Sequence, residues 1–408
     1  MYSKGNTAFD KIKTPLLNAV SIVFKTLSFL NLKRKARRSR KFPALVISID
    51  NLSFGGTGKT TLVTEIGTQL EKKNIPFAVV TRGYKSKYEH TGTRVQPSHD
   101  FTDVGDEAKI YKTRFPRQNI YVGKNRQKSM ENAAADNNKI ILLDDGFQTT
   151  NIRKDITVML VNLNHPYYYL RNFKFLMKNE DFIFIYNPGH GTAPPEPRPL
   201  LNPRLAAGLP IFGTYDFIPG GFFDTAGNPV DIGNSPILGF SALGDNLRFK
   251  NDLSAFNLAE FTGFADHHVY TQKEIKALDN RRKERDAAYL VCTEKDFIKM
   301  GWHPNPLARP ILFPYSESIS KASSFCKGSQ GINKMGRRPN PPRTALGFSF
   351  FEDIISKACS FCKGSQGINK TKSINLTNIP LIYFRNSIKL DIELMDVILD
   401  YAEKENYI

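Results

Sequence analysis

Short apolar runs alternate with longer amphipathic stretches along the chain from residue 42 onward. The predicted strands cover residues 44–49, 77–81, 119–122, 140–143, 157–161 and 182–186. The predicted helices between them cover residues 60–73, 106–114 and 126–137. Because crossover helices connect successive strands of a parallel sheet, this alternation predicts an α/β fold with a mostly parallel sheet.

Pro and Gly become frequent between residues 188 and 236, a composition typical of domain junctions. A smaller second α/β domain is predicted after it, with strands at 237–240, 288–292 and 379–384 and helices at 247–256, 271–282 and 392–403. The expected organisation is an N-terminal segment (1–41), a first domain (42–220) and a second domain (236–408).

A near-duplicate peptide interrupts the second domain. Residues 319–334 (ISKASSFCKGSQGINK) recur at 355–370 (ISKACSFCKGSQGINK) with one difference. Two copies are too few for a solenoid, which needs about three stacked repeats. We expect residues 317–375 to be an inserted, mobile segment of low functional content.

The N-terminal segment pairs an apolar stretch with positive charge. Residues 16–32 have apolar side chains at close to helical spacing, and the basic tract that follows (33–41) holds seven Lys or Arg residues in nine positions. The stretch is too short and too polar for a spanning helix, which needs about 20 apolar residues. It predicts an amphipathic helix on an anionic membrane surface. A helix packed on its own domain, followed by a solvated linker, is the alternative.

Charge points to an anionic partner. The 408 residues include 57 Lys and Arg against 39 Asp and Glu, a net charge of +18, in a composition that excludes a disordered or fibrous protein. Nucleic acid, a membrane surface and a phosphorylated substrate all fit this charge. Few aromatic residues interleave the basic tract, so nucleic-acid binding is not expected.

The four cysteines are Cys292, Cys326, Cys359 and Cys362, and they lack the paired spacing of a zinc site. This usage favours a reducing, cytoplasmic environment. Cys359 and Cys362 match C-x-x-C, but they lie in the duplicated peptide and outside any strand-to-helix turn, so redox chemistry is not favoured.

A glycine-rich phosphate loop joins the first predicted strand to the first helix. It reads Gly55-Gly56-Thr57-Gly58-Lys59-Thr60, followed by Thr61. Such a turn presents backbone N–H groups to phosphates; Lys59 is placed to reach the terminal phosphates and the Thr60 hydroxyl to bind Mg²⁺. The full motif has glycine where this chain has Ser53. The loop predicts a P-loop NTPase core that binds a nucleoside triphosphate and Mg²⁺.

Carboxylates supply the remaining chemistry. Asp144 and Asp145 end an apolar strand, as Mg²⁺ ligands of P-loop proteins do, although helix capping is an alternative. Asp106 opens a helix and is either a general base for an attacking hydroxyl or a helix cap. Asp266-His267-His268 contains the only adjacent histidines, for which a structural role is the alternative because no third metal ligand lies nearby.

These motifs, in this order, resemble the tetraacyldisaccharide 4'-kinase family, which phosphorylates the lipid A disaccharide precursor at the membrane. Residues 50–60 resemble the family's phosphate loop, including its lack of glycine at position 53. The other matching segments are 81–84 (TRGY), 104–107 (VGDE), 144–148 (DDGFQ), 240–244 (FSALG), 266–268 (DHH) and 293–296 (TEKD). The resemblance covers about 10–310 and 378–403.

The resemblance implies an ATP-dependent kinase acting on the 4'-hydroxyl of a tetraacylated glucosamine disaccharide 1-phosphate. It implies Asp106 as the base, supported by Asp266 and His267, with Lys59 at the phosphates. The enzyme would lie at the cytoplasmic face of the bacterial inner membrane, with no obligate protein partner.

Two positions depart from the family pattern: Thr149 replaces a histidine and Asn172 a glutamate. They leave open a degenerate member that binds nucleotide without transfer. A P-loop nucleotide switch at the membrane surface, acting through the basic tract, is a separate alternative function.

Overall fold

The computed structural model describes residues 8–53, 56–163, 170–187, 211–266, 268–300, 379–390 and 394–408. The expected insert at 317–375 lies outside these residues, and so do Cys326, Cys359 and Cys362. Gly55 and His267 also fall outside them.

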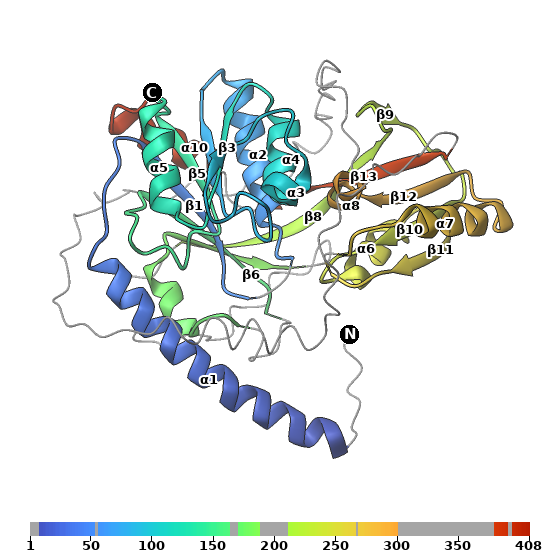
Figure 1. The fold of residues 1–408 in the computed structure, drawn as a ribbon, viewed down its shortest axis with the longest axis horizontal. Coiled ribbons are helices and arrows are strands. Elements are labelled where there is room, and N and C mark those ends of the chain that lie inside the picture. The colour runs from blue at the N-terminus through green and yellow to red at the C-terminus, as the bar shows by residue number, and fades with distance from the viewer. Residues whose placement is uncertain are drawn as a thin grey trace, which may run out of the picture.

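One sheet runs through the whole molecule (Figure 1). Within the described residues it has 13 strands. In sheet order, these are β11 (Leu258–Gly263), β10 (Ile237–Ser241), β12 (Tyr289–Thr293), β13 (Leu381–Leu390), β8 (Ile211–Phe223), β7 (Phe182–Tyr186), β6 (Ile156–Val161), β1 (Leu45–Asn51), β5 (Ile140–Asp144), β2 (Ala78–Thr81), β4 (Asn119–Val122) and β3 (Thr93–Arg94), with β9 (Pro229–Val230) beside β8. Most neighbours are parallel; β3–β4, β8–β9 and β8–β13 are antiparallel. The predicted α/β class with a mostly parallel sheet is confirmed.

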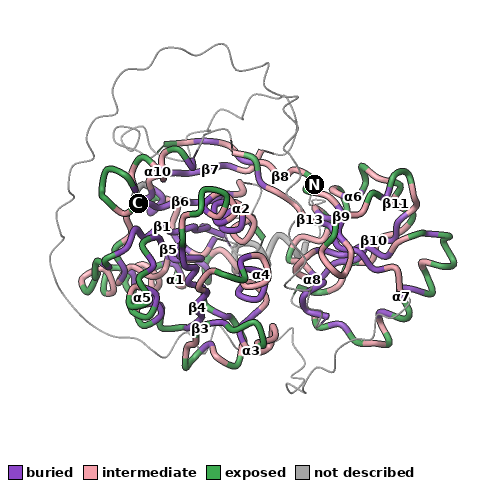
Figure 2. The backbone as a smooth tube through the Cα atoms, turned by 90° about the horizontal axis from the view of Figure 1, so that it is seen from above, coloured by how far each residue is buried: buried purple, intermediate pink, exposed green. Residues whose placement is uncertain are grey.

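Strands β1 to β7 and their helices form the phosphate-loop unit. Helices α2 (Lys59–Lys72) and α4 (Asp106–Arg114) cover one face of the sheet, where their apolar side chains meet those of β1. Helix α5 (Arg126–Ala135) covers the opposite face. Both faces are therefore buried, which is why these strands are continuous apolar runs. Figure 2 shows the strands as mostly buried, with exposure concentrated on the outer helices and turns.

A short turn of helix, α3 (Phe101–Val104), precedes α4. Its N-cap is Asp100, whose side chain accepts hydrogen bonds from Thr102 and Asp103 in a capping box. This cap starts α3, and Gly105 then separates α3 from α4.

The second unit consists of β10, β11 and β12 with three helices, α6 (Asn246–Leu253), α7 (Gln272–Glu284) and α8 (Glu294–Lys299). It has a core of its own, in which Phe240, Leu290 and Phe297 are buried. Thr271 and Glu274 form a capping box that starts α7. This unit lies to the right of the phosphate-loop unit in Figure 1.

Strands β8 and β13 connect the two units. Residues 211–215 of β8 pair with β7, and residues 215–223 pair with β13. The Pro- and Gly-rich composition of residues 188–236 predicted only a junction, yet this 13-residue strand forms within it. The sheet therefore continues from one unit into the other.

The C-terminal helix α10 (Leu394–Lys404) packs on the phosphate-loop unit. Ile398 and Ala402 are fully buried there, in the same core as Leu45 of β1. The sequence pattern had grouped this helix with the second domain, because it follows β13 in the chain.

Helix α1 (Ala8–Ala36) extends beyond the body of the phosphate-loop unit (Figure 1). Leu32, near its C-terminal end, is buried beside Leu170 and Met177. Met177 lies in the 3₁₀ helix η2 (Lys174–Asn179), and Leu170 precedes that helix. Val20, Val23 and Leu30 are each more than half exposed. No helix in the described part of the chain combines the length and apolarity needed to cross a membrane.

Candidate active site

The phosphate loop lies at the carboxyl end of β1 and turns directly into α2. Gly58 is the N-cap of α2 with φ of +93°, and a Cβ there would lie 2.7 Å from Cζ of Phe217. The positive φ and the lack of room for a Cβ therefore both require glycine at position 58. The Tyr215 hydroxyl donates a hydrogen bond of 2.8 Å to the Thr57 carbonyl, so β8 supports the loop from outside. The first N–H groups of α2, from Lys59, Thr60 and Thr61 onward, lie where a helix start attracts anions.

Asp145 is held by two cations. Arg171 donates two hydrogen bonds to its carboxylate, at 2.6 and 2.9 Å, and Lys59 Nζ lies 3.9 Å from Oδ1. Burial alone would raise the pKa of Asp145, but the charges of Arg171 and Lys59 outweigh it and hold that pKa well below its usual range. Arg171 also donates to the side chain of Asn51 at the end of β1. Asp145 is thus a fixed anion that orients Lys59.

Asp144 is fully buried at the end of β5. Its Oδ2 accepts hydrogen bonds from Thr81 Oγ1 at 3.1 Å and from the Tyr111 hydroxyl at 3.0 Å. Its Oδ1 is buried and has no hydrogen-bond partner within the described residues. Burial, reinforced by the carboxylate of Glu107, raises the pKa of Asp144 to about 7. A cation beside Oδ1 would satisfy this oxygen and favour the ionised carboxylate.

The donor chemistry around the loop fits Mg²⁺. The described residues hold no group of three His, Cys, Asp or Glu side chains arranged for a metal ion. Mg²⁺ in nucleotide sites needs fewer protein ligands, because it keeps waters and takes oxygens from the phosphates. Thr60, Asp144 and Asp145 supply one hydroxyl and two carboxylates, and Asp144 Oδ1 is an acceptor without a donor.

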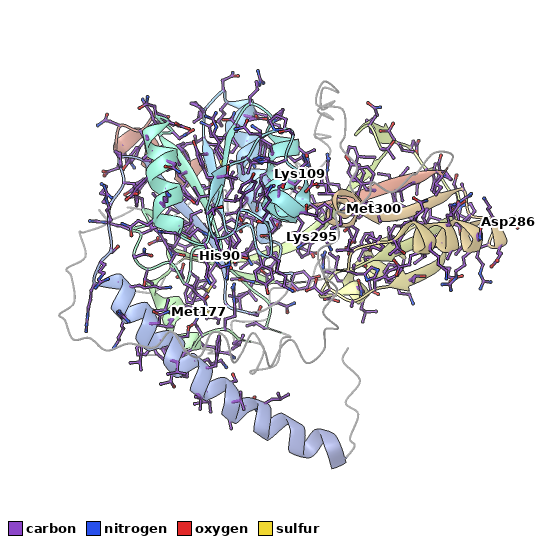
Figure 3. The ribbon with its side chains drawn as sticks, in the orientation of Figure 1. His90, Lys109, Met177, Asp286, Lys295 and Met300 are labelled. Atoms are coloured by element: carbon purple, nitrogen blue, oxygen red, sulfur yellow. The ribbon has the colours of Figure 1, made fainter. Side chains whose placement is uncertain are left out.

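Asp106 begins α4 and faces the second unit. Its Oδ1 accepts the Glu107 N–H at 2.9 Å, and its Oδ2 lies 3.1 Å from Lys295 Nζ on α8. Figure 3 shows Lys295 at the junction of the two units. Burial would lower the pKa of Lys295, but Asp106 and Glu107 outweigh it and raise that pKa, with a smaller contribution from Asp266. The structure thus brings Asp106, Lys295 and Asp266 into one electrostatic cluster.

Two glycines make room for the start of α4. Gly105, with φ of +91°, lies so close to Gly83 that a Cβ on Gly105 would be 3.1 Å from the Gly83 Cα. Gly83 belongs to the TRGY segment and Gly105 to the VGDE segment. The close approach explains why both segments carry glycine, and it places Arg82 and Tyr84 next to the turn that carries Asp106.

A second ion cluster joins the units at the other end of α4. Glu294 of α8 accepts two hydrogen bonds from Arg114 in the last turn of α4, at 2.8 and 3.0 Å, and one from Arg385 of β13 at 3.0 Å. The Arg385 guanidinium also lies 4.0 Å from the ring centroid of Phe223. Helix α4 is therefore bound to α8 at both of its ends.

Of the two adjacent histidines, the structure describes only His268. His268 Nε2 lies 3.1 Å from Glu274 Oε1, and its ring stacks on Phe264, so this residue serves the local structure of the second unit. Asp266 is described and contributes to the field at Lys295. His267 lies outside the described residues, so its predicted role stays a prediction.

A model of the tetraacyldisaccharide-1-P 4'-kinase family matches residues 13–324. The chain belongs to this family. The predicted resemblance is confirmed, and the sites described above lie within the matched range or, for Arg385, in the strand that completes the sheet beyond it.

Curated relatives of this 4'-kinase family member carry the same description. The tetraacyldisaccharide 4'-kinase of Chlamydia trachomatis is 29% identical over 309 residues, which cover 71% of this chain and 80% of that protein. The one from Desulfatibacillum aliphaticivorans is 25% identical over 345 residues, covering 78% and 93%.

A solved structure, LpxK from Aquifex aeolicus in complex with ATP, matches 94% of this chain and 99% of its own. The TM-score is 0.58 and the identity 18%, which establishes the shared fold.

The two departures from the family pattern have distinct settings in this 4'-kinase family member. The Thr149 N–H donates to the Gly146 carbonyl at 2.8 Å and closes the turn after the aspartate pair. Asn172 is fully buried, and its Oδ1 accepts a hydrogen bond of 2.7 Å from Ser28 on α1. In this chain, the residue after Arg171 therefore contacts the N-terminal helix.

Sequence reasoning missed three contributors. It quoted Lys295 only inside a matching segment, gave Arg171 no role, and did not single out Tyr111. Each acts through a partner distant in the chain: Asp106, Asp145 and Asp144 respectively. For Lys295, the sequence held a signal. The segment TEKD (293–296) matches the family, and Thr293 alone caps α8, so helix capping does not account for the lysine.

Proposed function

We propose that this chain transfers the γ-phosphoryl group of ATP to the 4'-hydroxyl of a tetraacylated glucosamine disaccharide 1-phosphate. The observation that carries the proposal is the placement of an acidic side chain, Asp106, apart from the phosphate loop and at the start of a helix that faces the second unit. A nucleotide switch needs the loop and the metal ligands, whereas a kinase also needs a base for its acceptor. ATP as donor is supported by the ATP complex of the solved relative.

In the proposed reaction, Asp106 accepts the proton of the 4'-hydroxyl as its oxygen forms a bond to the γ-phosphorus. The bond from that phosphorus to the β–γ bridging oxygen breaks, and ADP leaves with the electron pair. Lys295 and the start of α4 keep Asp106 oriented, and Asp266 with His267 supports it. Lys59 and the N–H groups of α2 stabilise the charge on the phosphates.

We place Mg²⁺ at Thr60, Asp144 and Asp145. When bound, it would offset negative charge on the transferred group. Arg171 keeps Asp145 in place, and Thr81 and Tyr111 keep Asp144 in place, so the ligands need little rearrangement to receive the cation.

We further propose that α1 and the basic tract (33–41) hold the enzyme on the cytoplasmic face of the inner membrane, where an acylated substrate lies. Exposed Val20, Val23 and Leu30 could enter the headgroup region, while Lys33 and Arg34 attract anionic lipid. The contact between Ser28 and Asn172 places this helix next to the active-site segment that carries Arg171.

Substitution of the proposed base tests the reaction. The full chain is incubated with ATP, Mg²⁺ and an acylated glucosamine disaccharide 1-phosphate, and bisphosphorylated product is measured. We expect Asp106→Asn to lower turnover by about 10²–10⁴-fold, the range for loss of a general base, with ATP affinity retained. Asp136→Asn, a carboxylate paired with Arg94 on the far side of the unit, is the matched control.

The outcomes separate the alternatives. Normal turnover by Asp106→Asn would refute the base assignment. ATP binding by the wild-type chain without product would favour a degenerate member, and ATP hydrolysis that is independent of any acceptor would favour a nucleotide switch.

A further inference from the structure

Tyr111 occupies a position in α4 where packing alone does not require its hydroxyl. The side chain is fully buried in the core that also contains Phe77 and Phe115, where a phenylalanine would fill similar space. A buried hydroxyl costs free energy unless it forms a hydrogen bond. Here the hydroxyl donates to Asp144 Oδ2 at 3.0 Å.

Asp144 is held through only one of its two oxygens. Tyr111 and Thr81 both donate to Oδ2, from two elements that approach the carboxylate separately, α4 and β2. Oδ1 is buried without a partner in the part of the chain that the structure describes. Two donors on one oxygen fix the rotation of the carboxylate and leave the other oxygen as its available acceptor.

We propose that Tyr111 is a positioning residue for the metal: its hydroxyl fixes the Asp144 carboxylate so that Oδ1 is presented to Mg²⁺. This inference rests on the magnesium site of the proposed function. It gives α4 two tasks, because the helix begins with Asp106, on the acceptor side, and contacts Asp144, on the donor side, five residues later.

A consequence concerns communication between the substrates. Lys295 and Glu294 of α8 hold the two ends of α4 through Asp106 and Arg114. A displacement of α4 relative to the sheet would move the base and loosen the metal ligand together. Tyr111 thus links α4, which the second unit holds at both ends, to the proposed metal ligand Asp144.

The experiment measures magnesium binding without turnover. The ATP affinity of the full chain is determined by calorimetry in EDTA and during a titration with Mg²⁺, for wild type, Tyr111→Phe and Tyr121→Phe. Tyr121 is the matched control, because its hydroxyl donates to the carboxylate of Asp136, the residue after α5, on the opposite face of the sheet from α2 and α4. Phenylalanine preserves the ring packing in both variants.

We expect Tyr111→Phe to leave metal-free ATP affinity within about twofold and to raise the Mg²⁺ midpoint roughly tenfold, the effect of losing one hydrogen bond to a charged group. Tyr121→Phe should change neither value. A Mg²⁺ midpoint equal to that of wild type in Tyr111→Phe would overturn the inference. A purely structural role would weaken metal-free ATP binding as well, which also overturns it.

Failure of the underlying site gives a different result. If ATP binding by the wild-type chain does not respond to Mg²⁺, the proposed magnesium site is wrong, whatever the variants do. If Tyr111→Phe does not fold, Thr81→Val removes the other donor to Oδ2. It is expected to raise the Mg²⁺ midpoint in the same direction, and an unchanged midpoint would contradict the fixed-carboxylate mechanism.

Discussion

At the scale of single residues, two independent sources of positive potential act on the Asp106 carboxylate. The first turn of α4 contributes the partial charge of a helix start, and Lys295 contributes a full charge from the other unit at 3.1 Å. Both attract the carboxylate and hold it in one orientation, so Lys295 positions Asp106 for its proposed role.

Removal of that cation should slow transfer without preventing nucleotide binding. We expect Lys295→Met to lower kcat by roughly tenfold or more, the value of one charge-assisted hydrogen bond, while KM for ATP changes little. Lys295→Arg should recover part of the rate. Steady-state kinetics at saturating lipid substrate measures both, and Lys283→Met, which removes an exposed cation paired with Asp279 on α7, is the control. A normal kcat in Lys295→Met would show that Asp106 needs no such partner.

The residues that could be predicted share one property: their chemistry is encoded locally. Lys59 and Thr60 follow a glycine turn, and Asp144 and Asp145 end an apolar run, so a short window identifies them. Tyr111 reads as one more apolar-face residue of a helix. Its proposed role depends on the approach of α4 to β5, which only the folded chain shows.

At the scale of elements, α1 has two unlike sides. Leu32 is buried against the segment around Leu170, whereas Val20, Val23 and Leu30 are more than half exposed. Exposed aliphatic side chains on one helix, next to a tract of Lys and Arg, are typical of helices that lie in a membrane interface. The helix extends from residue 8 to 36, beyond the predicted 16–32, and at its C-terminal end Lys33, Arg34, Lys35 and Ala36, all residues of good helix propensity, continue it.

The exposed side of α1 should govern vesicle binding. We expect Val20→Asp combined with Val23→Asp to weaken sedimentation with vesicles containing anionic lipid by tenfold or more, since two apolar contacts are lost and two negative charges are gained. Leu247→Asp, at an exposed apolar position on α6, is the matched control. Equal binding of the double variant and wild type would place the membrane contact elsewhere.

Strand β8 shows where element prediction fails. Its sequence contains Pro219, Gly220 and Gly221, which usually signal a turn, and the sequence pattern indicated a junction there. The pairing with β13 shifts register between Arg385 and Asn386, opposite these residues, so the strand continues through an irregularity. Long-range pairing overrides local preference here.

At the scale of the whole molecule, the units are joined by a continuous sheet and by charged side chains. Glu294 lies between Arg114 and Arg385, and only a small part of its side chain is exposed. Burial alone would raise the pKa of Glu294, but the two arginines outweigh it and lower that pKa to about 2. The folded state therefore prefers the ionised carboxylate more strongly than the unfolded chain does.

The stability contributed by Glu294 should depend on pH with a definite sign. Because the folded pKa lies below the unfolded value of about 4.3, the contribution is complete above that value and is lost as pH falls toward 2. We expect Glu294→Gln to cost about 2–3 kcal/mol of unfolding free energy at pH 7, and less at pH 3.

Urea unfolding followed by circular dichroism at both pH values measures this difference. Glu131→Gln, which breaks the exposed pair with Arg40, should change stability by under about 0.5 kcal/mol throughout. A cost for Glu294→Gln that does not vary with pH would contradict the assigned ion cluster.

The position of β13 and α10 also affects how the protein is made. β13 lies between β12 and β8, and α10 fills the core of the phosphate-loop unit, yet the ribosome synthesises both after every other described element. Until they emerge, the phosphate-loop unit exposes the apolar surface that Ile398 and Ala402 cover, and residues 215–223 of β8 lack their pairing with β13. Folding during translation therefore stops short of the native state until β13 and α10 are released, and the apolar surface exposed in that interval favours aggregation.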